Sequence, residues 1–369
     1  MEVKLAEKFD KRKKYEILRE KLLAYIKERH LGRNDQLPTV REIMNNMGFS
    51  YTTVVRTLND MEKDGIIKKQ QGKGIFINNL TPPSKQELAQ IALIIPKNYS
   101  DYKIFMGILS GVQSELENRG YNLLISISNM NHEKEREAVY NLLENHVSGL
   151  IIFLEDNYQN NYSHIEELIL RKVPFVLVDR YIPQLETDYV VVDNEKGMYK
   201  VCSYLKYSQW CKNIIFIYPN ESFLKISSTM EKISGYRYAT EVLYGHHFAR
   251  IYSIDEFKTN MAEIAQSGEK IGVCFNHDEM IEDLEEELKR EGKSLPKNFV
   301  IFGYANSLNQ PKYPTVEQFN EKVGEEAVKI LLAKIENPGA PVVQKRIEPK
   351  LILPDRKGNY HLEDYFLND

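Results

Sequence analysis

The chain has 369 residues, of which 42% are apolar and 28% are charged, and its formal net charge at pH 7 is −4. These values are typical of an ordinary globular protein, and the length allows two or three domains. No apolar run approaches the roughly 18 residues that a membrane helix needs, and the N-terminus is charged from its second residue, so we expect neither a membrane span nor a secretory signal.

The cysteines favour a reducing compartment. Cys202, Cys211 and Cys274 are few, odd in number and without the spacing of a metal site. We therefore expect a cytoplasmic protein with no disulfide framework, no metal and no cofactor.

The charge is unevenly distributed. Residues 1–80 carry 17 Lys/Arg and 11 Asp/Glu, a net +6, whereas the remainder carries a net −10. A small basic segment on a large acidic body indicates a nucleic-acid-binding head. The alternative is a solvated basic helix face.

The basic segment predicts three helices in succession. Apolar residues three or four apart predict the first helix over 15–26. Thr39 and Glu42 have the spacing of a capping box that opens the second, which Gly48 ends. The third begins after Ser50 and is stopped by Gly65.

The stretch "IIKKQQGKGIFI" then predicts a hairpin, because two β-branched runs flank a polar turn with glycines. A nucleotide-binding loop is excluded, since that motif needs Ser or Thr after its lysine and Gly74 follows Lys73. Three helices and a hairpin predict a winged helix-turn-helix. Gly72 and Gly74 would let the wing approach DNA closely, and Lys73 would neutralise a phosphate.

The same residues resemble a known family. "LPTVREIMNNMGFSYTTVVRTLNDMEKDGIIKKQQGKGIFI" is similar to the DNA-binding domain of GntR-family bacterial regulators, over about Tyr15 to Ile77. The resemblance implies DNA contacts at Arg41, Ser50, Tyr51, Thr52 and Thr53 and at the wing residues Gly72, Lys73 and Gly74.

Arg56 joins this set through a departure from the family pattern. Many members place an arginine directly after the Thr-Val pair, where this chain has Val55, and Arg56 follows one residue later. The alternatives without DNA contact are that Thr52 and Thr53 only begin a helix and that Arg41 is only a surface charge.

The polar stretch "NNLTPPSKQE" predicts a linker, assigned to residues 80–89, between domains at 1–79 and 90–369. Beyond it, seven short apolar runs alternate with helical stretches: "IALII", "YNLLISI", "GLIIFL", "VPFVLVD", "NIIFIY", "IGVCF" and "FVIFG". This alternation predicts parallel sheets covered by helices, and its length fits two α/β lobes. A ligand would then bind between the lobes, at the carboxyl ends of the strands.

This part also resembles a family. "MGILSGVQSELENRGYNLLIS", "HVSGLIIF", "VPFVLVDR", "HDEMI" and "EPKLILPDR" occur in the order seen in LacI-type effector domains, which are similar to periplasmic sugar-binding proteins. A GntR-type head on such a body resembles the arabinose-repressor type of bacterial regulator. In that type the ligand is commonly a sugar.

The resemblance implies ligand contacts at Phe105, Asp179, Lys232, His277 and Asp278. Lys232 stands where the family usually has an arginine, and His277 stands where it has an asparagine. The family's aspartate after Gly-Tyr is replaced by Ala305. As plain structural alternatives, Asp179 and Asp278 could cap helices, Lys232 could be a surface residue, and Phe105 could belong to the core.

No catalytic motif is present: the sequence has no G-x-S-x-G elbow, no H-E-x-x-H and no zinc-spaced cysteine pair. The prediction is therefore a non-enzymatic, homodimeric regulator that binds operator DNA. We expect it to repress sugar-utilisation genes and to be released by a sugar or sugar derivative. The alternatives are a sensor of a nucleoside, a phosphosugar or another small polar ligand, and an enzyme fused to a DNA-binding head.

Overall fold

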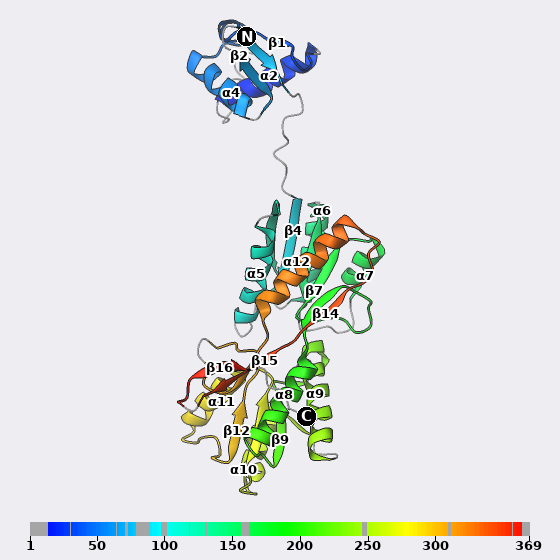
Figure 1. Cartoon of the computed structure of the whole chain (residues 1–369), viewed down its shortest axis with the longest axis vertical. Coiled ribbons are helices and arrows are strands. Elements are labelled where there is room, and N and C mark those ends of the chain that lie inside the picture. Colours follow the sequence, from blue (N-terminus) through cyan, green and yellow to red (C-terminus); the bar gives the residue numbers. More distant parts are fainter. Residues whose placement is uncertain are drawn as a thin grey trace. The chain divides into compact units, whose positions relative to one another are not determined.

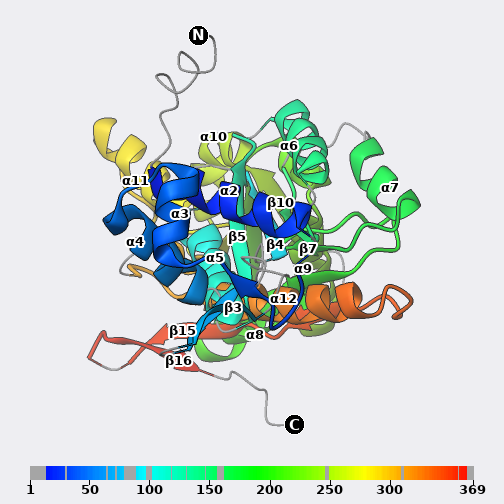
Figure 2. The ribbon, with the colours of Figure 1, turned by 90° about the horizontal axis from the view of Figure 1, so that it is seen from above.

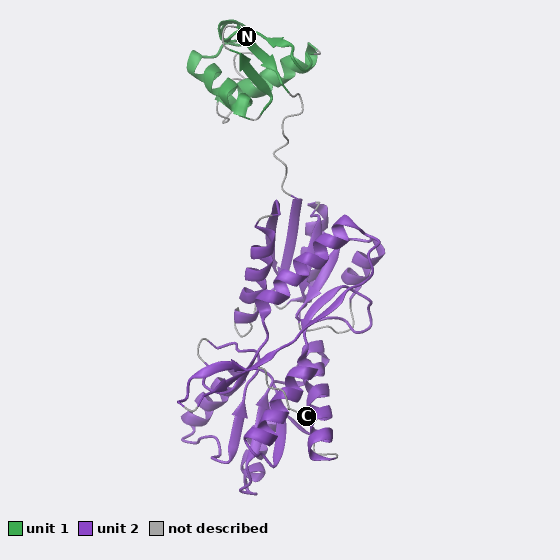
Figure 3. Cartoon of the chain, in the orientation of Figure 1, with its two compact units in different colours: residues 1–88 green, residues 89–369 purple. Residues whose placement is uncertain are grey.

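The computed structural model describes residues 14–29, 31–63, 65–70, 73–78, 89–96, 102–117, 119–129, 131–145, 147–155, 162–245, 249–308, 311–355 and 357–363. The chain forms two compact units, Met1–Leu88, here called the head, and Ala89–Asp369, here called the body (Figure 3). Of the predicted linker at 80–89, only Ala89 lies within the described residues, and it begins a strand of the body.

The head is a winged helix-turn-helix, as predicted. Three helices pack around one apolar cluster and are joined by a small antiparallel sheet of order β1-β3-β2. Its elements are α2 (Lys14–Glu28), β1 (Gln36–Leu37), α3 (Val40–Met47), α4 (Tyr51–Lys63), β2 (Ile67–Gln70) and β3 (Gly74–Ile77).

The predicted helix ends of the head are confirmed. Thr39 and Glu42 form the capping box of α3, in which each side chain binds the other's backbone N–H. Gly48 and Gly65, after α3 and α4, have φ angles of 74° and 69°, which glycine adopts without steric cost.

The first lobe of the body is built on a six-stranded parallel sheet of order β14-β8-β7-β6-β4-β5 (Figure 1). Its strands are β4 (Ala89–Ile95), β5 (Tyr121–Ile127), β6 (Gly149–Phe153), β7 (Phe175–Val178), β8 (Tyr189–Val192) and β14 (Gln344–Ile347). Its helices are α5 (Tyr102–Leu116), α6 (His132–Glu144), α7 (Ser163–Leu170) and α12 (Asn320–Glu336).

Helices cover both faces of this sheet, as the sequence predicts. Ile91 and Leu93 of β4 belong to the cluster that includes α5 and α12, whereas Ala92 and Ile94 belong to the cluster that includes α6 and α7. Figure 2 shows these helix pairs on opposite sides of the strands. Because alternate side chains of a strand point to opposite faces, a strand buried on both is apolar throughout.

The second lobe holds a four-stranded parallel sheet of order β10-β9-β11-β12 and a three-stranded antiparallel sheet of order β13-β15-β16. The strands are β9 (Asn213–Tyr218), β10 (Arg250–Ser253), β11 (Ile271–Phe275), β12 (Phe299–Phe302), β13 (Thr315–Glu317), β15 (Lys350–Pro354) and β16 (Tyr360–Glu363). The helices are α8 (Asn194–Ser203), the π-helical turn η1 (Tyr204–Ser208), the 3-10 turn η2 (Glu221–Lys225), α9 (Ser227–Tyr244), α10 (Ile254–Ala265) and α11 (Glu279–Arg290).

The described chain passes between the lobes three times: from β8 to α8, from β13 to α12 and from β14 to β15. In both sheets the parallel strands end near these crossings. The carboxyl edge of the first-lobe sheet therefore lies next to that of the second-lobe sheet, at the place here called the lobe junction. No helix among the described residues is long and apolar enough to cross a membrane.

Candidate functional site

The recognition helix α4 presents a polar face to solvent. Tyr51 is 60% exposed, and Thr52 and Arg56 are also exposed. Ser50 caps the helix, because its Oγ accepts the N–H of Thr53 (3.4 Å) and lies 2.8 Å from the Thr53 Oγ1. Thr52 Oγ1 also lies 3.1 Å from Ser50 Oγ, so the hydroxyls of Ser50, Thr52 and Thr53 are partly engaged with one another, whereas the Tyr51 ring is exposed.

Two arginines flank this face. Arg41 is exposed on α3. The guanidinium carbon of Arg56 lies 4.2 Å from the centre of the Tyr15 ring on α2, a cation–π contact that restrains the side chain. The sequence held no signal for this pairing of Arg56 with Tyr15, because the two residues lie on different helices.

The wing lies between β2 and β3. Lys73 is exposed in the turn, and its carbonyl accepts a hydrogen bond from Gln36 Nε2 (3.0 Å). Gly74 has a φ angle of 122°, which side-chain-bearing residues rarely adopt. Gly72 lies outside the described residues.

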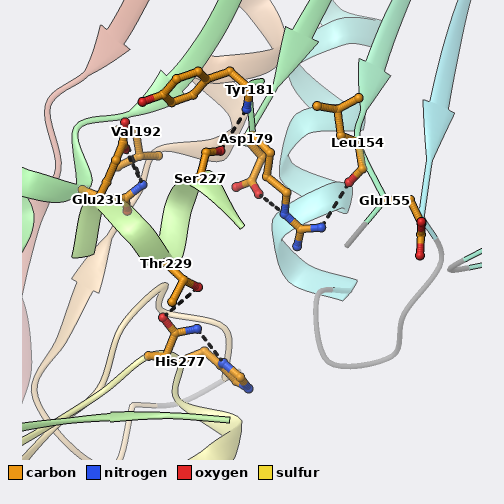
Figure 4. Close-up of polar contacts among 12 residues, drawn as sticks. Leu154, Glu155, Asp179, Tyr181, Val192, Ser227, Thr229, Glu231 and His277 are labelled. Carbon is orange, nitrogen blue, oxygen red and sulfur yellow. Dashed lines mark hydrogen bonds and ion pairs between the residues drawn. The ribbon is translucent and has the colours of Figure 1, made fainter. Parts of the chain in front are cut away.

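The effector-site prediction concerns the meeting edges of the two lobes. Asp179 directly follows β7, is 8% exposed and has a φ angle of 63°. The adjacent Arg180 places Nε 3.3 Å from Asp179 Oδ2, donates from Nη1 to the Leu154 carbonyl (3.1 Å) and lies over the Phe153 ring. The first lobe thus offers a buried carboxylate and a buried guanidinium side by side (Figure 4).

The second lobe supplies residues from α9 and from the end of β11. Lys232 is 6% exposed, donates from Nζ to the Asn276 carbonyl (2.9 Å) and lies over the Tyr304 ring. Asn276 also accepts a hydrogen bond from Thr229 (3.3 Å). Burial, together with the nearby charge of Lys232, lowers the pKa of His277 to about 3, so this imidazole is neutral at pH 7.

Direct hydrogen bonds hold the two edges together. The Tyr181 N–H, two residues after Asp179, donates to Ser227 Oγ at the start of α9 (3.0 Å). Further along α9, Glu231 pairs with Arg346 of β14 (2.7 Å). Figure 4 shows Asp179 and Glu155 on one side of this junction and Thr229 and His277 on the other.

Asp278 and Phe105 are placed differently. Both carboxylate oxygens of Asp278 accept hydrogen bonds within the second lobe, from Thr315 Oγ1 and from Ser307. Asp278 stands at the start of α11 but makes no side-chain cap there. Phe105 is 6% exposed and belongs to the core cluster that includes α5 and α12.

Comparison with known proteins divides the chain in the same way. Residues 14–77 match the family described as bacterial regulatory proteins, gntR family. The head is a gntR-type DNA-binding domain. Residues 207–353 match the family described as periplasmic binding protein-like domain.

One relative is similar to the gntR-type head and the body together. The arabinose metabolism transcriptional repressor of Geobacillus stearothermophilus is 25% identical over 355 residues, which cover 92% of this chain and 96% of the relative.

Two solved structures resemble the body in fold. A putative ribose operon repressor from Burkholderia thailandensis has a TM-score of 0.59 at 21% identity, over 71% of this chain and 98% of its own. A LacI family transcriptional regulator from Enterococcus faecium with bound ribose has a TM-score of 0.56 at 23% identity, over 71% and 96%. The body therefore has the fold of LacI-family regulators, as the sequence predicts.

Several residues near the lobe junction were not predicted. Arg180 and Asn276 were missed although each directly adjoins a predicted position. Gln318, which is 3% exposed at the β13–α12 crossing, has a side-chain oxygen that accepts no hydrogen bond from the described residues. A buried acceptor of this kind suits a ligand hydroxyl, but nothing in the local sequence distinguishes it.

Proposed function

We propose that this protein is a sugar-responsive transcriptional repressor that acts as a homodimer in the cytoplasm. The observation that carries the proposal is the union, in one chain, of a gntR-type head with a periplasmic-binding-protein-like body. A named arabinose metabolism repressor is similar over 92% of the chain, and a structural neighbour of the body holds ribose.

The chemistry of the lobe junction supports a polyhydroxylated ligand. Asp179 offers acceptor oxygens, and Arg180 and Lys232 offer charged donors, which form strong hydrogen bonds with hydroxyl groups. The neutral ring of His277 has Nδ1 3.4 Å from Asn276 Nδ2, from which it can accept, and this leaves Nε2 to donate to a ligand. We place the effector between these residues, with Phe105 retained as a candidate apolar wall.

On the DNA, we assign base reading to the exposed face of α4 and phosphate contacts to the wing. Tyr51, Thr52 and Arg56 would face base edges, whereas Lys73 would neutralise a phosphate. Arg41, Ser50, Thr53, Gly72 and Gly74 complete the proposed surface. Two heads in one dimer would bind half-sites about one helical turn apart.

The proposed mechanism is linkage between two sites and involves no chemical step in the protein. A sugar that binds one arrangement of the lobes more tightly shifts the population toward that arrangement. If that arrangement binds the operator less well, the sugar releases the repressor, and the operator must weaken sugar binding by the same factor.

The experiment uses the full chain and an operator selected from random DNA duplexes. Operator binding is titrated with L-arabinose, D-ribose and cellobiose separately, and we expect one of them to release the DNA. Asp179→Asn should need about tenfold more sugar, because it replaces a charged acceptor by a neutral one at a left-handed position that asparagine tolerates.

Asp255→Asn is the matched control, because the Asp255 side chain is 89% exposed on α10. Release by none of the sugars, with operator binding intact, would contradict the sugar assignment while leaving the DNA-binding assignment standing.

A further inference from the structure

The loop between β12 and β13 has unusual backbone geometry. Ala305 and Asn306 have φ angles of 85° and 46°, so two consecutive residues other than glycine lie in the left-handed region. Such conformations are costly and persist only where surrounding contacts hold them. The loop directly follows Tyr304, whose ring lies beneath the Lys232 ammonium, 4.4 Å from Nζ.

Asp278 supplies those contacts. Thr315 Oγ1 donates to the carboxylate, 2.8 and 3.0 Å from its two oxygens, and Oδ2 also accepts the Ser307 N–H (2.9 Å). Thr315 Oγ1 in turn accepts the Asn306 N–H (3.2 Å). These hydrogen bonds hold two successive backbone amides of the left-handed loop. The Asn306 amide binds Thr315, which binds Asp278, and the Ser307 amide binds Asp278 directly.

A backbone hydrogen bond and close packing at two glycines also restrain the loop. The Asp278 N–H donates to the Tyr304 carbonyl (3.1 Å). A Cβ at Gly303 would lie 1.8 Å from Asp278 Oδ1, so only glycine lets the carboxylate sit this close to the backbone. A Cβ at Gly197 of α8 would lie 2.2 Å from the Tyr304 hydroxyl, which leaves the ring no room to shift toward α8.

The hydrogen bonds of Asp278 argue against direct ligand contact. Each of its carboxylate oxygens already accepts a hydrogen bond within the second lobe, and Thr315, which donates to them, is itself only 1% exposed. We propose that Asp278 is a positioning residue. Together with Thr315 it holds the 303–307 loop, so that the Tyr304 ring keeps the Lys232 ammonium in position to bind the effector. This inference rests on the proposed function, because it assigns a role within the same effector site.

The test compares variants of Thr315 with variants of Asp278 in the full chain. Thr315→Val keeps the shape but removes the hydroxyl, and Thr315→Ser keeps the hydroxyl as the matched control. Affinity for L-arabinose and D-ribose is measured by calorimetry. If Asp278 acts through the loop, Thr315→Val and Asp278→Ala each weaken binding about tenfold, and the double variant is no weaker than the weaker single variant.

Hydrogen exchange of the ligand-free protein gives a second readout. Ser307 donates to Asp278 and not to the Thr315 side chain, so its amide exchanges faster in Thr315→Val only if the network acts as a unit. Thr315→Ser should exchange and bind like the wild type. If Thr315→Val does not fold, Asp278→Asn takes its place in both measurements, because it keeps the shape of the side chain.

Two results would overturn the proposal. Wild-type sugar affinity in Thr315→Val, with weak binding in Asp278→Ala, would show that Asp278 touches the ligand directly. Unchanged Ser307 exchange in Thr315→Val would show that no positioning network exists. Failure of the wild type to bind either sugar would instead contradict the proposed function, and the exchange measurement would still decide whether Asp278 holds the loop.

Discussion

Single side chains on and beside the proposed DNA-binding surface differ in how firmly they are held. Arg56 rests on the Tyr15 ring, and Lys69 of β2 is paired with Glu62 (2.9 Å). The Lys73 ammonium, at the tip of the wing, is exposed and is paired with no side chain in the described part of the head. A free, flexible charge suits a phosphate, whereas a restrained guanidinium suits a base edge.

We therefore predict different consequences for two substitutions in the head. Lys73→Ala should weaken binding to all operator variants about equally and lower the slope of log affinity against log salt by about 1, because one released counterion is lost. Arg56→Ala should change the relative affinities between operator variants. Filter binding at several salt concentrations measures both effects.

The control for these variants is Lys289→Ala, an exposed lysine on α11 of the body, which should leave operator binding unchanged. A change in base preference at one operator position on Lys73→Ala would show that the wing reads bases.

The ionisation of the Asp278 carboxylate should make the stability of the protein depend on pH. Burial raises its pKa to about 6, from an ordinary value of 3.8, even though hydrogen bonds from Thr315 and Ser307 lower it. Between these two pH values the folded protein binds more protons at this site than the unfolded protein does. The contribution of Asp278 to stability therefore falls as pH rises from about 4 to about 6.

Asp278→Asn should remove this dependence. Between pH 5 and pH 7.5 the stability of the wild type relative to Asp278→Asn should fall by about 1 kcal/mol, because roughly one pKa unit of the shift lies in that window. Urea unfolding of both proteins at the two pH values measures it. His277, whose lowered pKa acts in the opposite sense below pH 6.5, is present in both proteins and cancels.

A stability difference that stays constant across this pH range would contradict the raised pKa.

Among the elements, α5 and α12 make an unusually close crossing in the first lobe. A Cβ at Gly111 would lie 1.8 Å from the Glu321 carbonyl oxygen, and one at Gly324 would lie 2.2 Å from the Ile108 carbonyl oxygen. Glycines on both helices thus allow backbone-to-backbone contact. This crossing fixes α12, which begins directly after a passage between the lobes.

Gly111→Ala should destabilise the body by roughly 1 to 3 kcal/mol, the usual cost of forcing extra volume into a packed contact. Chemical denaturation measures the loss. Gly339→Ala is the matched control, since a Cβ there would meet its nearest atom, the Asn337 side-chain oxygen, at 3.6 Å. Equal stability of the two variants would show that the helices can separate without cost.

At the scale of the whole molecule, the β5 edge of the first lobe presents an apolar surface that a second copy could cover. β5 is an edge strand of the first lobe, and Ile125 and Ile127 on one face of it are 49% and 45% exposed. Met106 on α5, the helix that covers this face, is 38% exposed. We place the proposed dimer contact here, because an apolar strand at a sheet edge is a common site of association.

Ile127→Asp should then convert the dimer to a monomer in sedimentation experiments. Operator affinity should fall at least tenfold, because the two heads no longer bind as one bivalent unit. Leu170→Asp is the matched control, since Leu170 is 81% exposed on α7, away from β5. A dimer that persists in Ile127→Asp would place the contact on another surface.

Local sequence was sufficient for the helices and hairpin of the head, for seven of the thirteen strands described in the body and for the type of each fold. The capping box of α3, the glycine stops and the seven apolar runs of the body all became the helix ends and strands that were predicted. These features depend on neighbours a few residues apart, so side-chain type and spacing determine them. The left-handed backbone of Asp179 and Ala305, in contrast, has no local signature, because neither residue is glycine.

Tertiary structure decided the positions of distant segments. β14 was not predicted as a strand, because its sequence "QKRI" is half polar, and it becomes one by pairing with β8 across about 150 residues of chain. The cation–π contact of Arg56 with Tyr15 and the hydrogen bonds from Thr315 and Ser307 to Asp278 likewise join residues that are distant in the sequence. Sequence spacing determines which side chains a helix or strand presents, but hydrogen bonds between elements depend on the packed fold, and they decide which of those side chains remain free for a ligand.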